Sequence, residues 1–120
     1  MISRATIIHK PNSPEAEAIS QDLGKFLLSR KISVEYEDVV KDSLIDKARA
    51  DLVIVVGGDG TIMRALRRTN SVPLLGVKVG ALGFLCESTP EDAKHVLEKI
   101  LSGKYYLEYR TRLSIQYRGK

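Results

Sequence analysis

The strongest constraint on the fold is an unbroken apolar run that is followed at once by glycines. Residues 52–56 read Leu-Val-Ile-Val-Val, and residues 57–61 read Gly-Gly-Asp-Gly-Thr. A strand that is apolar on both faces is typical of a parallel sheet covered by helices on both sides. A stretch with helical character, residues 62–68, comes next. The sequence therefore predicts a strand–loop–helix unit at the centre of an α/β fold.

The loop combines features of an anion site with one negative charge. Glycines let the backbone turn sharply and approach a ligand, and the free N–H groups of a helix start attract anions. Asp59 would repel phosphate, so we expect it to hold a metal ion, accept a proton or bond a hydroxyl. This combination predicts phosphoryl transfer to an alcohol. The alternative is that Asp59 only caps the helix, but the complete five-residue run behind a buried strand favours the functional interpretation.

Two better-known phosphate loops do not match this one. The Gly-Lys-Ser/Thr ending of a Walker A loop is missing. Met63 stands where the dinucleotide-binding fingerprint has its last Gly or Ala. The loop therefore belongs to a different design.

A second block of sequence narrows the choice of protein family. Residues 73–85 read Pro-Leu-Leu-Gly-Val-Lys-Val-Gly-Ala-Leu-Gly-Phe-Leu, and together with residues 57–61 they resemble the two signatures of the NAD kinases. The first signature also occurs in diacylglycerol-kinase-like lipid kinases, and phosphofructokinases have a near variant, so the second block carries the distinction. Two positions depart from the family pattern: Lys78 replaces a polar uncharged residue, often Asn, and Ala81 replaces a larger polar or basic residue.

The resemblance implies an activity and a set of site residues. The γ-phosphoryl group of ATP, bound with Mg²⁺, would pass to the 2′-hydroxyl of the adenosine ribose of NAD, giving NADP. Asp59 would be the catalytic residue, as the base or orienting group for that hydroxyl. Thr61 would either bond a phosphate or cap the helix. The implied binding residues are Gly57, Gly58, Gly60, Thr61, Met63, Leu82, Gly83 and Phe84.

The resemblance also implies a domain division. Residues 1–104 would form the nucleotide-binding domain, and residues 105–120 a strand segment that leads to a β-rich domain. The Asn-Glu pair of the family does not occur in this sequence, so we expect this chain alone to be inactive. The expected partners are NAD and ATP, and the complete protein is expected to be a homo-oligomer. Two alternatives remain: a lipid or sugar kinase with the same loop, and a non-catalytic nucleotide-binding module.

The element order predicts an open, doubly wound, Rossmann-like sheet that is mostly parallel, with helices on both faces. Strands are expected at residues 5–9, 32–36, 52–56 and 73–79. One helix is expected to begin at Ser13 and Pro14, a capping hydroxyl followed by proline at the first helical position. Another is expected to open at residues 89–92 and to end at Gly103. Residues 105–117 alternate at period two and are strand-like, with an edge left exposed.

Charge and composition limit the other possibilities. The net charge is +4, and residues 60–120 carry 11 basic and five acidic side chains. We favour solvated surface charges as the interpretation of Arg64, Arg67 and Arg68, with nucleotide steering second and nucleic-acid binding a distant third. There is no apolar run of the ~18 residues that a membrane span needs. The single cysteine, Cys86, can form no internal disulfide, so we expect a cytoplasmic protein without membrane or nucleic-acid partners.

The histidines and the cysteine do not suggest a metal site. His9, His95 and Cys86 are too far apart in sequence to have metal-ligand spacing, so no metal ligands are expected. His9 ends the first strand, near the same edge of the sheet as Asp59, and is interpreted as a histidine with its hydrogen bonds satisfied. His95 is expected on the surface, and Cys86 as a small buried residue.

Overall fold

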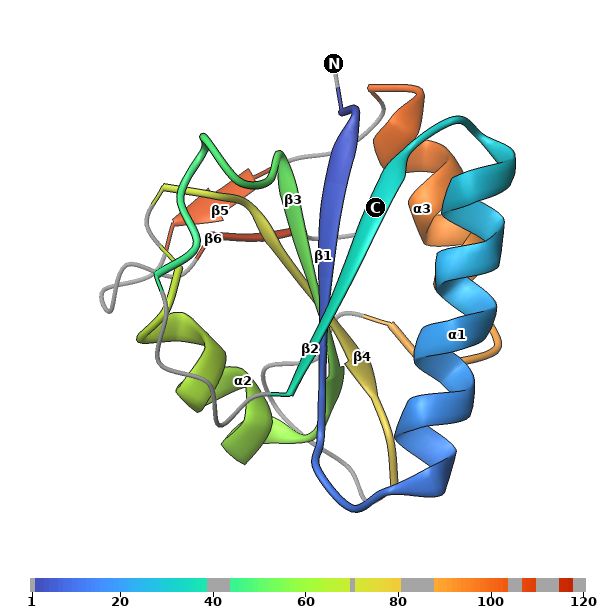
Figure 1. Ribbon diagram of the computed structural model, residues 1–120, viewed down its shortest axis with the longest axis vertical. Helices are drawn as coiled ribbons and strands as arrows, with labels where there is room; N and C mark the ends of the chain where they lie inside the picture. Colours follow the sequence, from blue (N-terminus) through green and yellow to red (C-terminus); the bar gives the residue numbers. More distant parts are fainter. Residues whose placement is uncertain are drawn as a thin grey trace.

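The chain forms one sheet with helices on both faces (Figure 1). The computed structural model describes residues 2–38, 44–69, 71–80, 88–103, 107–109 and 115–117. The strands are β1 (Arg4–His9), β2 (Ser33–Asp38), β3 (Leu52–Gly57), β4 (Leu74–Lys78), β5 (Leu107–Tyr109) and β6 (Ile115–Tyr117). The helices are α1 (Pro14–Ser29), α2 (Asp59–Leu66) and α3 (Ala93–Leu101).

The sheet topology confirms the predicted fold class. The strand order is β2-β1-β3-β4-β6-β5, and every neighbouring pair except β5–β6 is parallel. From β1 the chain moves outward to β2, and from β3 it moves outward in the opposite direction to β4. The order therefore reverses between β1 and β3, which creates a crevice at their carboxyl ends where ligands bind in open α/β sheets.

The two faces of the sheet carry separate cores. Alternate residues of β1 and β3 point to opposite faces, so Ile7 and Ile54 pack beneath α1 and α3, whereas Ile8 and Val55 pack beneath α2. All six residues of β3 are buried. The apolar run 52–56 thus has the double-sided burial that its sequence predicts.

The helix starts depend on local hydrogen bonds. The Ser13 side chain accepts a hydrogen bond from the Ala16 N–H at 3.2 Å, with Pro14 in the first helical turn, as predicted. The prediction for the third helix is wrong by about one turn. Thr89 and Asp92 hydrogen-bond to each other in a separate turn, and α3 begins only at Ala93. It ends before Gly103 as predicted, where φ is +78°.

The alternating segment at the end of the chain forms two short strands and not one. β6 pairs in parallel with β4, and β5 pairs in antiparallel fashion with β6 at the edge of the sheet. Residues 104–106 and 110–114 lie outside the described residues. The proposed domain boundary at 104/105 stays a prediction.

A buried ion-pair network joins β2 to the end of α2 and corrects one prediction. Arg68 is only 4% exposed, and its guanidinium donates to the carboxylate of Glu37, which is also buried. Arg49 donates to the same carboxylate and, at 3.2 Å, to Glu35. Arg68 is therefore not a solvated surface charge. Burial alone would raise the pKa of Glu37, but hydrogen bonds and charge from Arg68 and Arg49 outweigh it and lower that pKa.

Replacing Thr6 by Val is expected to stabilise the chain. Thr6 is 1% exposed in β1, and its hydroxyl has no hydrogen-bond partner among the described residues. Removing such a buried hydroxyl while keeping the shape should raise the free energy of unfolding by about 1 kcal/mol. The control is Ser20→Ala, because the buried Ser20 hydroxyl donates to the Ala16 carbonyl at 2.8 Å. Urea unfolding should show a gain only for Thr6→Val; a loss there would contradict the prediction.

Candidate functional site

The glycine loop lies at the crevice between the carboxyl ends of β1 and β3. Gly57 is the last residue of β3, and the loop continues directly into α2. Two backbone hydrogen bonds fix this edge: the Lys10 N–H donates to the Val56 carbonyl at 2.9 Å, and the Val79 N–H donates to the Gly57 carbonyl at 3.0 Å. The segments after β1, β3 and β4 are therefore held together at one end of the sheet.

Space, and not an unusual dihedral angle, requires the glycine at position 57. Among the described glycines, those with positive φ lie outside this loop, at Gly80 and Gly103. A Cβ on Gly57 would lie 2.6 Å from the Thr61 hydroxyl oxygen, so only glycine lets Thr61 fold back onto the end of β3.

Gly58 and Gly60 have a different property. A Cβ built on either residue would meet no described atom within 4 Å. With no side chain on either residue and no described atom in that space, a ligand can come close to the backbone there. This is the arrangement expected of a loop that binds a ligand through its backbone.

Asp59 occupies the first position of α2 and does not cap the helix. The N-cap is Gly58, in an extended conformation, and Asp59 follows it as a partly buried residue. Thr61, also named as a possible cap, is the third helical residue and is 8% exposed. Neither side chain therefore stands at the N-cap position of α2. A carboxylate in the first turn is stabilised by the positive end of the helix dipole.

A cavity of about 280 Å³ opens beside the loop, lined by Lys10, Pro11, Gly60, Thr61 and Arg64. Two of these residues are cations, from different parts of the chain: Lys10 follows β1, and Arg64 lies in the last turn of α2. Within the described ranges, neither is within ion-pair distance of a carboxylate. Together with the N–H groups at the start of α2, they make the cavity suited to an anion.

Lys10 is not among the residues that the sequence predicts for the site. The sequence does contain a signal for Lys10. In a doubly wound sheet in which β1 and β3 are neighbours, the residue that follows the first strand lies beside the central glycine loop. The place of Arg64 in this cavity agrees with the nucleotide-steering interpretation of that side chain. Arg67, the residue just after α2, is exposed and does not line the cavity.

The other residues that the sequence singles out lie in different surroundings, and some lie outside the described residues. Met63 is 44% exposed on α2 and is not part of the core. Leu82, Gly83 and Phe84 lie outside the described residues, as does Cys86. His9 is half-buried, and its Nδ1 is 3.2 Å from the Lys10 carbonyl oxygen, as expected of a satisfied histidine. His95 is exposed, as predicted.

In the part of the chain that the structure describes, no three His, Cys, Asp or Glu residues gather in a way that could hold a metal ion. Oxygen ligands such as Asp59 suit Mg²⁺, which usually keeps several waters and is bound through one or two carboxylates and substrate phosphates. The residues at the loop fit a Mg²⁺ ion that is bound through one carboxylate and the phosphates of a substrate. The helices within the described ranges are all too short or too polar to cross a membrane.

Fold and site together define an open α/β domain with a cation-lined cavity at its switch point. Residues 44–105 match the family model described as the ATP-NAD kinase N-terminal domain, and the chain belongs to this family. It is 34% identical to the NAD kinase of Methanothermobacter thermautotrophicus and 38% identical to that of Pseudoalteromonas translucida. The alignments cover 93% and 92% of this chain, but only 44% and 42% of the relatives.

Solved structures agree on the fold. An NAD kinase from Archaeoglobus fulgidus in complex with ATP superposes with a TM-score of 0.64 at 22% identity, over 87% of this chain and 40% of the other. A yeast NADH kinase complexed with NADH superposes with a TM-score of 0.63 at 20% identity, over 91% of this chain and 38% of the other. The chain therefore spans less than half the length of each of these four proteins.

Proposed function

We propose that this chain is the nucleotide-binding part of an NAD kinase, which transfers the γ-phosphoryl group of ATP to the adenosine ribose 2′-hydroxyl of NAD. The observation that carries the proposal is the position of Asp59, a carboxylate at the start of α2 and next in sequence to Gly60 and Thr61, which line a cavity with two cations. Family membership supports it. Positioning and charge neutralisation supply most of the catalysis in phosphoryl transfer, and this site offers both.

In this proposal Asp59 acts on the acceptor hydroxyl. A ribose hydroxyl is a very weak acid, so Asp59 would orient it and accept its proton late, as the bond to phosphorus forms. Gly57, Gly58 and Gly60 would give the nucleotide room against the backbone. Met63, Leu82, Gly83 and Phe84 belong to the proposal through the resemblance, as contacts to the rest of the nucleotide.

Lys10 and Arg64 would hold the phosphate chain. Charge-assisted hydrogen bonds from a lysine and an arginine to phosphate are stronger than neutral ones, and both side chains line the same cavity as Thr61. Mg²⁺ bound to ATP would neutralise the remaining phosphate charge. The proposal further includes a β-rich domain after residue 104, a homo-oligomeric complete protein and a cytoplasmic location.

The direct test is an assay of acceptor choice. The chain would be purified alone and joined to the remaining segment of the Methanothermobacter relative, and each form would receive ATP with NAD, diacylglycerol or fructose 6-phosphate. We expect NADP from the joined form only and no phosphorylated lipid or sugar. Preference for a lipid or sugar would establish the rival kinase class. Absence of any turnover in a folded joined protein would favour a non-catalytic module.

Removing either cation of the cavity should weaken ATP binding. Lys10→Gln and Arg64→Gln are each expected to raise the Kd about tenfold, because each removes one charge-assisted contact worth about 1.4 kcal/mol. The matched control is Arg67→Gln, which removes a positive charge just beyond the same helix but outside the cavity. Calorimetric titration of the chain with ATP would measure all three. Equal losses in the three variants would mean that only net charge matters.

A further inference from the structure

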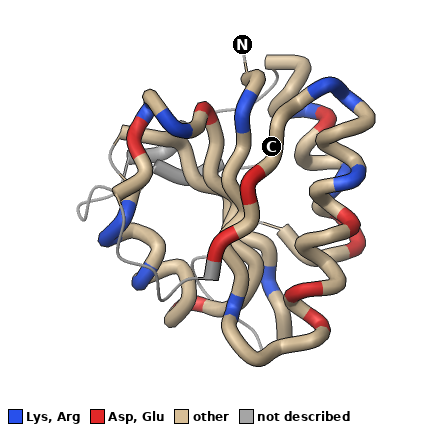
Figure 2. Tube along the Cα trace, in the orientation of Figure 1, with Lys and Arg blue, Asp and Glu red and all other residues tan. Residues whose placement is uncertain are grey.

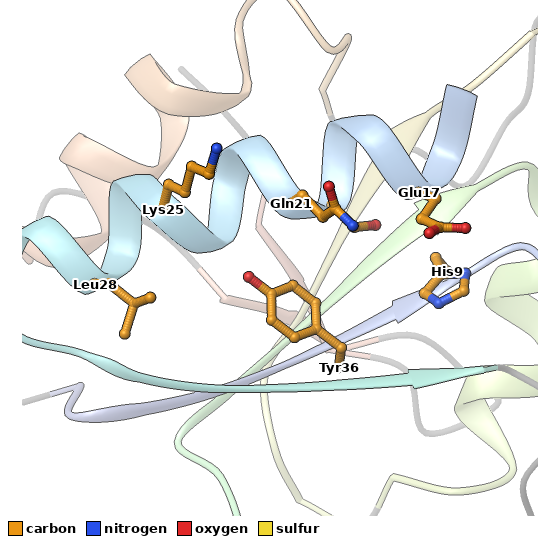
Figure 3. A pocket seen from close by; sticks show the side chains of 7 residues that line it. His9, Glu17, Gln21, Lys25, Leu28 and Tyr36 are labelled. Carbon is orange, nitrogen blue, oxygen red and sulfur yellow. The ribbon is translucent and has the colours of Figure 1, made fainter. Parts of the chain in front are cut away.

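A second, larger cavity lies away from the glycine loop, in a groove between α1 and the edge strand β2. Its volume is about 580 Å³, within the range of small-molecule sites. Figure 3 shows α1 side chains along one wall and Tyr36 of β2 facing them across the groove. It shares no lining residue with the cavity at the loop. The lining residues are His9, Glu17, Ser20, Gln21, Lys25, Leu28 and Tyr36.

The floor of the groove is the ring of Tyr36, and a glycine in α1 leaves the space that this ring occupies. Any Cβ at Gly24, in the middle of α1, would overlap the Tyr36 hydroxyl. A glycine inside a helix weakens it relative to alanine, and here it lets the ring lie close against α1. Tyr36 is still 44% exposed and Leu28 is 56% exposed. The ring and the leucine thus present an apolar surface on which a planar group can stack.

The two ends of the groove differ in hydrogen-bonding character. At one end the Nδ1 of His9 lies 3.2 Å from the Lys10 carbonyl oxygen, an acceptor, so this nitrogen carries the hydrogen and Nε2 is an acceptor in the neutral ring. Glu17 lines the same end and is also an acceptor. Two acceptors at this end of the groove call for a ligand group that donates N–H bonds.

The other end calls for an anion. Lys25 lies eight residues after Glu17 on α1, which places it about 12 Å further along the helix axis. In the described ranges no carboxylate is within ion-pair distance of Lys25. An added protein strand is disfavoured at this edge, because β2 carries the exposed, charged Glu35 (acidic positions are red in Figure 2) and charged edge strands resist pairing.

We propose that the α1–β2 groove is a second small-molecule site. Its ligand is a planar ring with an amino group at one end and an anionic group roughly 12 Å away, the form of a nucleoside monophosphate with an exocyclic amino group. The ring stacks on Tyr36, the amino group bonds to Glu17 and His9, and the anion pairs with Lys25. The site is separate from the glycine loop, although His9 and Lys10 connect the two cavities along the chain.

The test is an NMR titration of the isotope-labelled 120-residue chain with adenosine monophosphate. We expect saturable amide shifts at Gly24, Lys25 and Tyr36. Purine riboside 5′-monophosphate, which lacks the amino group, should bind about tenfold more weakly, because its ring has no N–H to donate to the two acceptors. Shifts confined to residues 57–64, or none up to about 10 mM, would overturn the proposal. Equal affinity for both nucleotides would overturn it as well.

Variants locate the contacts. Tyr36→Ala should lower the affinity for adenosine monophosphate about tenfold, and Tyr36→Phe, which keeps the ring, should change it less than about threefold. Lys25→Gln should lower it about fivefold, whereas the exposed Lys47→Gln, outside the groove, should leave it unchanged. Thermal melting of each variant verifies folding. An equal effect of Lys25→Gln and Lys47→Gln would mean nonspecific charge attraction and would contradict the site.

Discussion

Replacing Asp59 by Asn is expected to reduce kcat about 10²–10⁴-fold in an enzyme that contains this domain, with nucleotide affinity unchanged or slightly tighter. Asn keeps the size and an oxygen of the side chain, so the first turn of α2 should form as before. The change removes the negative charge, and with it the capacity to accept the proton of the acceptor hydroxyl. Binding should not suffer, because a repulsion between a carboxylate and the phosphates disappears.

The measurement is kcat and NAD affinity for the joined protein with and without the Asp59→Asn substitution, and thermal melting is the control on folding. The matched control is Asp92→Asn, another aspartate beside a helix start, whose carboxylate accepts a hydrogen bond from Thr89 at the surface. Asp92→Asn should leave kcat within about twofold, by the usual small effect of surface substitutions. A near-normal kcat in Asp59→Asn would exclude Asp59 from the chemical step.

The elements that the sequence predicts well are those with a local physical cause. The apolar run 52–56 can be stable only when both of its faces are covered, and the structure buries all of it. Ser13 and Pro14 are adjacent in the chain and supply both the cap and the fixed dihedral angle of a helix start. The position of Asp59 follows from the same local logic, because the loop directly connects the central strand to its helix.

The features that the sequence does not predict depend on which segments become neighbours and how their side chains pack. Lys10 enters the site only because β1 lies beside β3. Arg68 is buried because the fold brings it next to Glu37, which lies 31 residues earlier in the chain and accepts its hydrogen bond. At Gly57 the backbone angles are ordinary, and the need for glycine comes from the packing of the Thr61 side chain. No periodicity or composition encodes such contacts.

Replacing Glu37 by Gln is expected to lower the free energy of unfolding by about 3 kcal/mol, the low end for breaking a buried ion pair. Gln keeps the shape and an acceptor oxygen but removes the charge between Arg68 and Arg49, whose guanidinium groups both donate to this carboxylate. The control is Glu35→Gln, which removes the same charge from the same strand. Glu35 pairs with Arg49 as well but is 62% exposed, so its loss should cost no more than about 0.5 kcal/mol.

The pH dependence gives the Glu37 prediction an independent check. Because the folded-state pKa of Glu37 is lowered, its stabilisation is fully present above the unfolded pKa of about 4.3 and is lost as the pH falls through the folded value. Urea unfolding between about pH 7 and pH 3 should therefore show the difference between wild type and Glu37→Gln shrinking toward low pH, while Glu35→Gln follows the wild type. A difference that stays constant with pH would mean that packing, and not the carboxylate charge, holds β2 to the end of α2.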